Sequence, residues 1–486
     1  MTKVFRVSRR LVLLILAAAI VGLGWVAPAS AYEEAPMRVV TRGLTAEQHL
    51  QRQAELSQRL VRELPAEAAE RAVRVPFSAG EAAFIDQAPR TVSPLRVGLV
   101  KAVIPAVALT GLEGQPLRRT ADGVVWAAVV RSEEAGAIRL HVQDLSLPRG
   151  AELYVYSRDG QAYGPYTGAG PRFDGDFWTT ALFGNEAIVQ VKAAREADLA
   201  GATLRIPEAG LITKHFVGSL TEPILPAADG GMKRATAEAN WPCGNINCLV
   251  DATCSNVAAA NPAKLAVAKM EWVQGAFIYT CTGGLLSDNN PSQNNFLLTA
   301  NHCLSKNNAA SNVSFYWRYA TSSCNGTCPA NNGWPYITTG STVSATNRKG
   351  DFTLLHLNAA PPAGSVQLGW TNAPVANTNN AHLYRVSNPN FGPQVYSQHD
   401  VDTAAGTCSG WPRGERIYSR DITGAIDGGS SGSPILNASS QVVGQLSGTC
   451  GTNPNDACAS GPGEANATVD GAFAFYYNTV KPFLNP

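Results

Sequence analysis

The stretch Asp427–Ile435 reads DGGSSGSPI and lies well inside a chain of 486 residues. Its serines stand among glycines, which favours a tight turn that exposes a hydroxyl and directs backbone N–H groups toward one point. Such N–H groups can hold the oxyanion of an acyl-transfer intermediate. The alternative interpretation is a flexible Gly/Ser loop without chemistry. A histidine able to take the serine proton decides between the two.

Histidine and aspartate candidates lie upstream of this turn. His302 belongs to LLTANHCL (residues 297–304), where an apolar strand runs into a short turn. Cys303 follows it, and a Cys281–Cys303 bridge would clamp the loop that carries the imidazole. Asp351 opens the apolar run DFTLLHL and is placed to orient the ring and stabilise the imidazolium. Seen alone, they would be a structural histidine and a turn aspartate; together with the serine turn they favour catalysis.

The segments CTGG, LLTANHC, DFTLL and GGSSGSP, in this order, resemble the chymotrypsin-fold serine peptidases. The G-S-S-G-S-P form and the Cys248–Cys254 pair resemble the bacterial lysyl endopeptidase group, over about residues 243–477. The resemblance implies that Ser431 is the nucleophile, His302 the general base and Asp351 its orienting acid. It also implies an oxyanion hole made by the backbone N–H groups of Gly429 and Ser431.

The same resemblance implies the fold. We expect a mainly β protein, with a chymotrypsin-like double β-barrel that is preceded by a β-sandwich-like propeptide domain, and the site in the cleft between the barrels. The family pattern further implies that Cys254 pairs with Cys324 or Cys328, and Cys248 with Cys450 or Cys458. The partners of the other cysteines, Cys243 and Cys408 among them, stay open.

Substrate preference is less defined by the sequence. Trypsin-like enzymes carry an aspartate just before the nucleophile and another six residues before it, and here those positions are Ser430 and Ala425. Lysyl endopeptidases use an aspartate on a later strand, where NATVDGAF places Thr468, with Asp470 two residues away. A buried ammonium needs a carboxylate, so we expect Asp470 to line the pocket and basic residues to be preferred before the scissile bond. The alternatives are that Asp470 caps a turn at Gly471 and that small or apolar residues are preferred; the other candidate carboxylates are Glu464, Asp456 and Asp427.

Composition and the N-terminus indicate export. Four basic residues precede an apolar run and an Ala29-Ser30-Ala31 site, which is typical of a secretory signal; an uncleaved membrane anchor is the alternative. All ten cysteines lie between Cys243 and Cys458, as expected for disulfides in a secreted, extracellular protein. Cys324 and Cys328 have no second close ligand pair, so we expect no metal and no cofactor. The net charge of +1 gives no reason to expect a nucleic acid or a membrane as partner after signal cleavage; the expected partners of this monomer are protein or peptide substrates and its own propeptide.

Pattern changes along the chain predict its domains. An amphipathic helix is expected over Leu44–Leu64, short alternating strands from about Val73, and a linker rich in Pro, Ala and Gly around Lys233-Arg234. The predicted parts are a signal peptide (1–31), a helical pro-segment (32–72), a β-rich prodomain (73–207), a processing linker (208–242) and the peptidase domain (243–486).

The sequence allows three alternatives to a chymotrypsin-fold peptidase. Gly428–Gly432 approximates the G-x-S-x-G elbow of α/β-hydrolases, with Ser430 at its centre, but that class needs a histidine after the serine and none follows His399. A subtilisin-like order would place the acid first and needs alternating helices. A secreted binding protein with an inactive peptidase-like module is the non-enzyme alternative, and the presence of all three triad residue types disfavours it.

Overall fold

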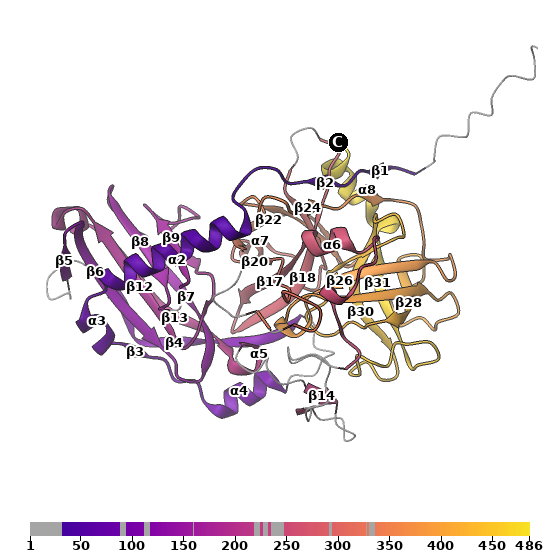
Figure 1. Ribbon diagram of the computed structural model, residues 1–486, viewed down its shortest axis with the longest axis horizontal. Coiled ribbons are helices and arrows are strands. Elements are labelled where there is room, and N and C mark those ends of the chain that lie inside the picture. Colours follow the sequence, from indigo (N-terminus) through magenta and orange to yellow (C-terminus); the bar gives the residue numbers. More distant parts are fainter. Residues whose placement is uncertain are drawn as a thin grey trace, which may run out of the picture. The chain divides into compact units, whose positions relative to one another are not determined.

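Alternating runs of branched and aromatic residues form the strands that dominate the computed structural model (Figure 1). It describes residues 32–87, 94–110, 117–158, 160–217, 224–226, 232–234, 247–290, 294–326, 328–329 and 336–486. The predicted signal peptide, most of the predicted processing linker and Cys243 therefore lie outside the described residues. Within the described residues, no helix has the length and apolar character needed to cross a membrane.

The N-terminal part is a two-layer β-sandwich, as predicted. One layer contains β4 (Leu95–Leu109), β7 (Ala135–Ser146), β10 (Phe177–Trp178), β11 (Leu182–Phe183) and β13 (Thr203–Thr213); the other contains β3 (Val73–Arg74), β5 (Leu117–Thr120), β6 (Gly123–Arg131), β8 (Ala151–Tyr156), β9 (Ala162–Tyr166) and β12 (Glu186–Ala193). Apolar side chains from both layers, Val97, Trp126 and Leu140 among them, form one buried cluster. Because β13 runs on to Thr213, the sandwich extends beyond residue 207, where the sequence placed its end.

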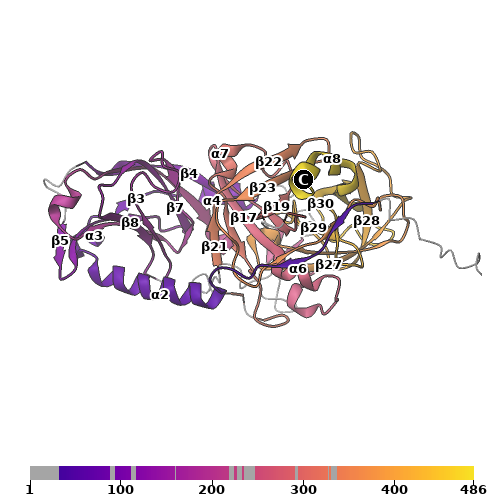
Figure 2. The same cartoon turned by 90° about the horizontal axis from the view of Figure 1, so that it is seen from above.

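The predicted amphipathic helix is α2 (Ala46–Glu63), which lies along the sandwich (Figure 2). Thr45 caps it, because its hydroxyl accepts from the Gln48 N–H while the Gln48 side chain accepts from the Thr45 N–H. Leu60 is buried against the outer face of the sheet that contains β6, β8 and β12. The shorter helices of this part are α3 (Ala66–Glu70), α4 (Ala79–Asp86) and α5 (Lys214–Val217).

Two β-barrels follow, as the resemblance implied. The first contains β17 (Val267–Gln274), β18 (Phe277–Leu286), β19 (Phe296–Thr299), β20 (Ser314–Trp317), β21 (Tyr336–Thr339), β22 (Ser341–Asn347) and β23 (Phe352–Leu357). The second is a closed ring of β26 (His382–Ser387), β27 (Val395–Val401), β28 (Arg416–Thr423), β31 (Asn466–Ala472), β30 (Val442–Gly451) and β29 (Pro434–Leu436). Further elements of the chain are β14 (Ile224–Pro226), β15 (Met232–Arg234), β16 (Val250–Asp251), β24 (Val366–Gln367), β25 (Trp370–Thr371), α6 (Asn261–Ala266), α7 (Asn307–Ala310) and the C-terminal α8 (Phe473–Leu484).

The sandwich and the first barrel share one continuous sheet. Strand β4 pairs antiparallel with β18 over Phe277–Thr280, so the order β7-β13-β4-β18-β17 passes from the sandwich into the barrel. Next to this junction, Arg139 of β7 forms an ion pair with Glu271 of β17, and both side chains are fully buried. The chain from Glu34 to the C-terminus is accordingly one compact unit.

The first described strands also pair with the barrel region. β1 (Glu34–Ala35) pairs with β25, and β2 (Arg38–Val39) pairs with β24. These residues, which the sequence assigned to a helical pro-segment, therefore make their backbone hydrogen bonds with the C-terminal half of the chain.

Candidate active site

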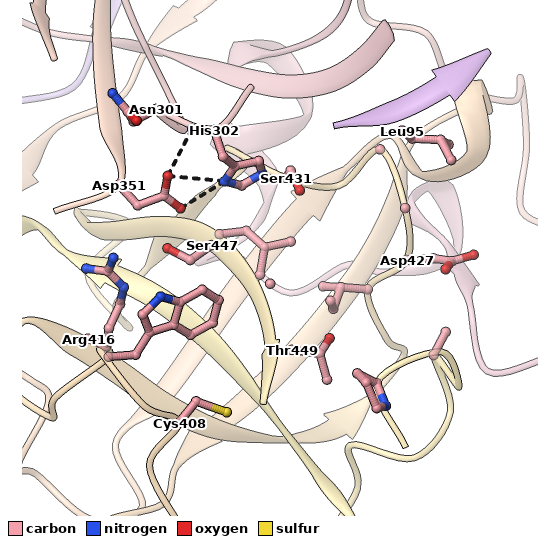
Figure 3. Close-up of a pocket in the computed structure, with 18 of the residues that line it drawn as sticks. Leu95, Asn301, His302, Asp351, Cys408, Arg416, Asp427, Ser431, Ser447 and Thr449 are labelled. Carbon is pink, nitrogen blue, oxygen red and sulfur yellow. Dashed lines mark hydrogen bonds and ion pairs between the residues drawn. The ribbon is translucent and has the colours of Figure 1, made fainter. Parts of the chain in front are cut away.

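The three predicted catalytic residues come together at one cleft of about 620 Å³ (Figure 3). His302 follows β19 and Asp351 precedes β23, so both stand at the ends of neighbouring strands of the first barrel. Ser431 precedes β29 of the second barrel. The fold thus brings together residues that lie up to 129 positions apart in the sequence.

His302 is held against Asp351. Its Nδ1 lies 2.9 Å from Asp351 Oδ2 and 3.1 Å from Oδ1, and its backbone N–H donates to Oδ1 at 3.0 Å. Since an ionised carboxylate can only accept, the proton of a neutral imidazole belongs on Nδ1. Nε2 is then the basic nitrogen; it is buried, has no hydrogen-bond partner within the described residues, and lies on the Ser431 side of the ring in Figure 3.

The surroundings of Asp351 favour the ionised form of its carboxyl and fix its backbone. Burial raises the pKa of its carboxyl, but the charge of His302 and the hydrogen bonds from that residue outweigh burial, so the pKa falls below its usual value. Its backbone has a φ of 51°, in the left-handed region. That conformation is held because the Asp351 carbonyl accepts from the Asn301 N–H and from the Gln445 side chain.

The serine turn needs its glycines. Gly429 and Gly432 have φ values of 93° and 82°, and a Cβ at Gly432 would lie 2.2 Å from Thr299 Oγ1. Thr282 fixes the turn between them, because its hydroxyl donates to the Gly429 carbonyl and its N–H to the Ser431 carbonyl, both at 2.8 Å. A backbone held in this way presents N–H groups in a fixed direction, as an oxyanion hole requires.

Ser430 is fully buried and faces away from the cleft lining. Its hydroxyl accepts from the Ser387 hydroxyl at 3.0 Å and from the Asp427 N–H at 3.3 Å. Neutral hydrogen bonds therefore hold this position, where animal trypsin-like enzymes have an aspartate that pairs with a new N-terminus.

Disulfides brace the site. Cys281 and Cys303 are bonded, which ties the loop after His302 to β18. Cys254 is bonded to Cys324, Cys248 to Cys458 and Cys408 to Cys450. The last pair, which the sequence left open, places Cys408 on the cleft wall.

Asp470 does not line the cleft, so the prediction of a pocket carboxylate there is wrong. Its side chain is fully buried and forms an ion pair of 2.5 Å with Arg385, which is also fully buried. Arg385 reaches it from β26 across the interior of the second barrel, which no sequence pattern on β31 reveals. Glu464 and Asp456 are also absent from the cleft lining; Asp427 belongs to it, but its carboxylate accepts from Asn390 at 2.7 Å and turns away from Ser431 in Figure 3.

A buried acid that the sequence analysis missed lies behind the cleft wall. Asp421 Oδ1 accepts from Thr468 Oγ1 and lies 2.7 Å from His399 Nδ1, while Oδ2 has no hydrogen-bond partner within the described residues. Thr468 pairs directly with Thr449, a cleft residue, across β30 and β31. Paired residues face the same side of a sheet, so the Thr468 side chain lies beside that of Thr449. Asp421, which is hydrogen-bonded to Thr468, is therefore separated from the cleft by one side chain.

Two family models match the chain. A model of the lysyl endopeptidase C-terminal domain matches residues 245–459, and a model of the lysyl endopeptidase N-terminal domain matches residues 75–212. A lysyl endopeptidase of Pseudomonas aeruginosa is 28% identical over 372 residues, which are 74% of this chain and 75% of that protein.

Solved structures also match over about half of the chain. The Rv3671c protease from M. tuberculosis in its active form matches at 17% identity and a TM-score of 0.31, over 49% of this chain and 88% of that one. The HtrA-type protease AlgW with a tripeptide matches at 13% identity and a TM-score of 0.33, over 47% of this chain and 62% of that one.

Proposed function

Since the chain belongs to the chymotrypsin-fold serine endopeptidases and resembles the lysyl endopeptidase branch, we propose that it cleaves peptide bonds through a triad of Ser431, His302 and Asp351. The observation that carries this assignment is the His302 ring, whose Nδ1 is fixed by Asp351 and whose unpartnered Nε2 lies on the Ser431 side. Membership of this enzyme family also favours catalysis over the inactive binding module considered from the sequence.

The triad would act in two stages. His302 Nε2 removes the proton from Ser431 Oγ as this oxygen attacks the substrate carbonyl carbon, and the imidazolium is stabilised by Asp351. The backbone N–H groups of Gly429 and Ser431 hold the oxyanion. His302 then gives its proton to the leaving amine, which departs and leaves an ester on Ser431. Water attacks that ester with His302 again as base, which releases the acid product and restores the hydroxyl.

Labelling with a fluorophosphonate tests the triad without any assumption about the substrate. Ser431→Ala should abolish labelling and peptide hydrolysis, because the triad acts as a unit. Ser430→Ala, at the neighbouring buried serine, is the matched control and should keep most of both. If Ser430→Ala lost labelling while Ser431→Ala kept it, the nucleophile would be assigned to the wrong serine.

The proposed enzyme is a secreted, extracellular preproenzyme. The N-terminal signal and the disulfides support export. The sandwich would be the propeptide domain, joined to the peptidase by the predicted processing linker, and the processed enzyme would act on protein or peptide substrates without a metal or cofactor.

The proposed preference is for Lys or Arg before the scissile bond. The family match supports it, and Asp421 supplies a negative charge behind the wall at Thr449. Burying a carboxylate with one oxygen unpartnered is costly, and a substrate cation beside the wall would reduce that cost. Preference for small or apolar residues is the alternative, because Ala425 and Thr468 stand at the two positions where related enzymes have an aspartate that faces the substrate.

A further inference from the structure

Two buried side chains of β26 reach the serine turn from below the cleft. Arg385 and Ser387 are two positions apart on this strand, so they face the same side of it. Arg385 Nη1 donates to the Ser433 carbonyl at 2.9 Å and to Ser433 Oγ at 3.0 Å. The Ser387 hydroxyl donates to Ser430 Oγ at 3.0 Å. One strand therefore holds the turn on both sides of Ser431, at the residue before it and at the second residue after it.

Ser433 connects Arg385 to the backbone around the nucleophile. The Ser433 N–H donates to the Ser430 carbonyl at 3.0 Å, which closes a four-residue turn that contains Ser431. The Ser433 carbonyl accepts from the Leu446 N–H at 2.9 Å as well as from the guanidinium. A displacement of Ser433 would therefore be passed on to Ser431, to its hydroxyl and to its N–H group.

Arg385 is kept in the barrel interior by Asp470 of β31. The two side chains are fully buried and form an ion pair of 2.5 Å. Arg385 Nε and Asp470 Oδ2 have no hydrogen-bond partner within the described residues. Burying two charges with polar atoms left unpaired is costly, and apolar side chains of similar volume fill such a place at least as well. Stability of the barrel therefore gives no reason for this pair, whereas the bonds from Arg385 to Ser433 do.

We propose that Arg385 is a positioning residue for catalysis. Its guanidinium fixes Ser433, and through it the hydroxyl and the oxyanion donor of Ser431, while Asp470 supplies the counter-charge that the buried guanidinium needs. The proposal rests on the triad of the proposed function and adds a residue that touches neither the substrate nor the reacting atoms. Loss of Arg385 should slow the chemical step and leave substrate binding nearly unchanged, because preorganised donors act mainly on the transition state.

Replacing both charges separates positioning from stability. Arg385→Met/Asp470→Val exchanges the pair for apolar side chains of similar total volume, so the melting temperature should equal that of the wild type or exceed it. Its kcat should nevertheless fall about 10- to 100-fold, because the turn loses the donor that fixes Ser433. KM should stay within about threefold of the wild-type value, since the interaction removed acts in the transition state. A residue that served the fold alone would give wild-type kcat in this stable variant.

The assay uses the enzyme secreted after expression of the full chain, with active sites counted by fluorophosphonate titration. The substrate is a peptide anilide with whichever of Lys, Arg, Ala or Leu before the bond the wild type cuts fastest. Variants that process slowly are cut with affinity-tagged wild-type enzyme, which is then removed.

Arg420→Met/Asp402→Val is the matched control. Arg420 pairs with Asp402 at 2.7 Å in the same barrel, and its other hydrogen bonds go to the carbonyls of Glu464 and Asn466, not to the serine turn. Because this pair is partly exposed and does not hold Ser433, kcat should stay within about twofold of the wild-type value.

Arg385→Lys is the second variant, and it decides the matter if the double variant does not fold. A lysine keeps the positive charge beside Asp470, but its single ammonium lacks the planar fork that bonds Asp470 and Ser433 together. Its kcat should fall about tenfold, again with little change in KM.

The outcomes separate this proposal from the proposed function. Wild-type kcat in the folded Arg385 variants would overturn the positioning role and leave the triad standing, and so would a change confined to KM. Failure of the wild type to hydrolyse any anilide and to label with a fluorophosphonate would overturn the proposed function and the positioning role with it.

Discussion

The buried ion pair between Arg139 and Glu271 should determine how firmly the sandwich is attached to the first barrel. Both side chains are fully buried, with Arg139 Nη1 at 2.9 Å from Glu271 Oε1. Arg139 also donates to the carbonyls of Thr179 and Asn312. Glu271→Gln keeps the shape but leaves a buried guanidinium without its counter-charge, at a cost of about 3–5 kcal/mol.

The expected fall in the midpoint of thermal unfolding follows from the size of the compact unit that unfolds. For the roughly 450 residues from Glu34 to Pro486, the entropy of unfolding is about 1 kcal/mol/K. A loss of about 3–5 kcal/mol therefore lowers the midpoint of thermal unfolding by about 3–5 °C if the unit melts as a whole, and by more if the sandwich separates first. Differential scanning calorimetry of the full chain in a Ser431→Ala background, which cannot process itself, measures it.

Glu134→Gln is the matched control, because Glu134 forms an exposed ion pair with Lys214 in the sandwich. Exposed pairs contribute about 0–1 kcal/mol, so this midpoint should fall by less than about 1 °C. Equal small shifts for Glu271→Gln and Glu134→Gln would refute the reasoning that the buried pair holds the two parts together.

Four other results are expected. N-terminal sequencing of the secreted, active protein should place its start between Lys233 and Trp241; a sandwich still covalently attached to fully active enzyme would contradict the propeptide assignment. Cys281→Ser with Cys303→Ser should lower the free energy of unfolding by about 3 kcal/mol, measured by urea denaturation, and an unchanged midpoint would contradict it. Since the folded pKa of Asp351 is depressed, the stabilisation given by its ionised carboxylate is lost as the pH falls below its unfolded value of 3.8 and through the folded pKa; the difference in melting temperature between Ser431→Ala and Ser431→Ala/Asp351→Asn should therefore shrink below about pH 4. Asp421→Asn should lower kcat/KM for lysyl substrates about tenfold relative to leucyl ones, with Asp400→Asn as the control; an unchanged ratio would remove Asp421 from substrate selection.

Local sequence determined much of this protein. The positive φ values of Gly429 and Gly432 require glycine at these positions, so the turn could be predicted from the nine residues Asp427–Ile435 alone. His302 and Asp351 could be proposed because each stands where an apolar strand meets a turn. Alternating runs gave the strands, and the spacing of Leu56, Leu60 and their neighbours gave α2.

Tertiary structure alone decided which polar groups meet. Asp470 looked available for a substrate because its partner, Arg385, lies 85 positions away on another strand of the barrel. Asp421 belongs to no recognisable sequence motif. It is a candidate for substrate selection only because, in the folded protein, Thr468 of β31 lies between Asp421 and the cleft. The pairing of β4 with β18, which joins the sandwich to the first barrel, has a register that local periodicity cannot specify because either edge of a strand presents the same N–H and C=O groups.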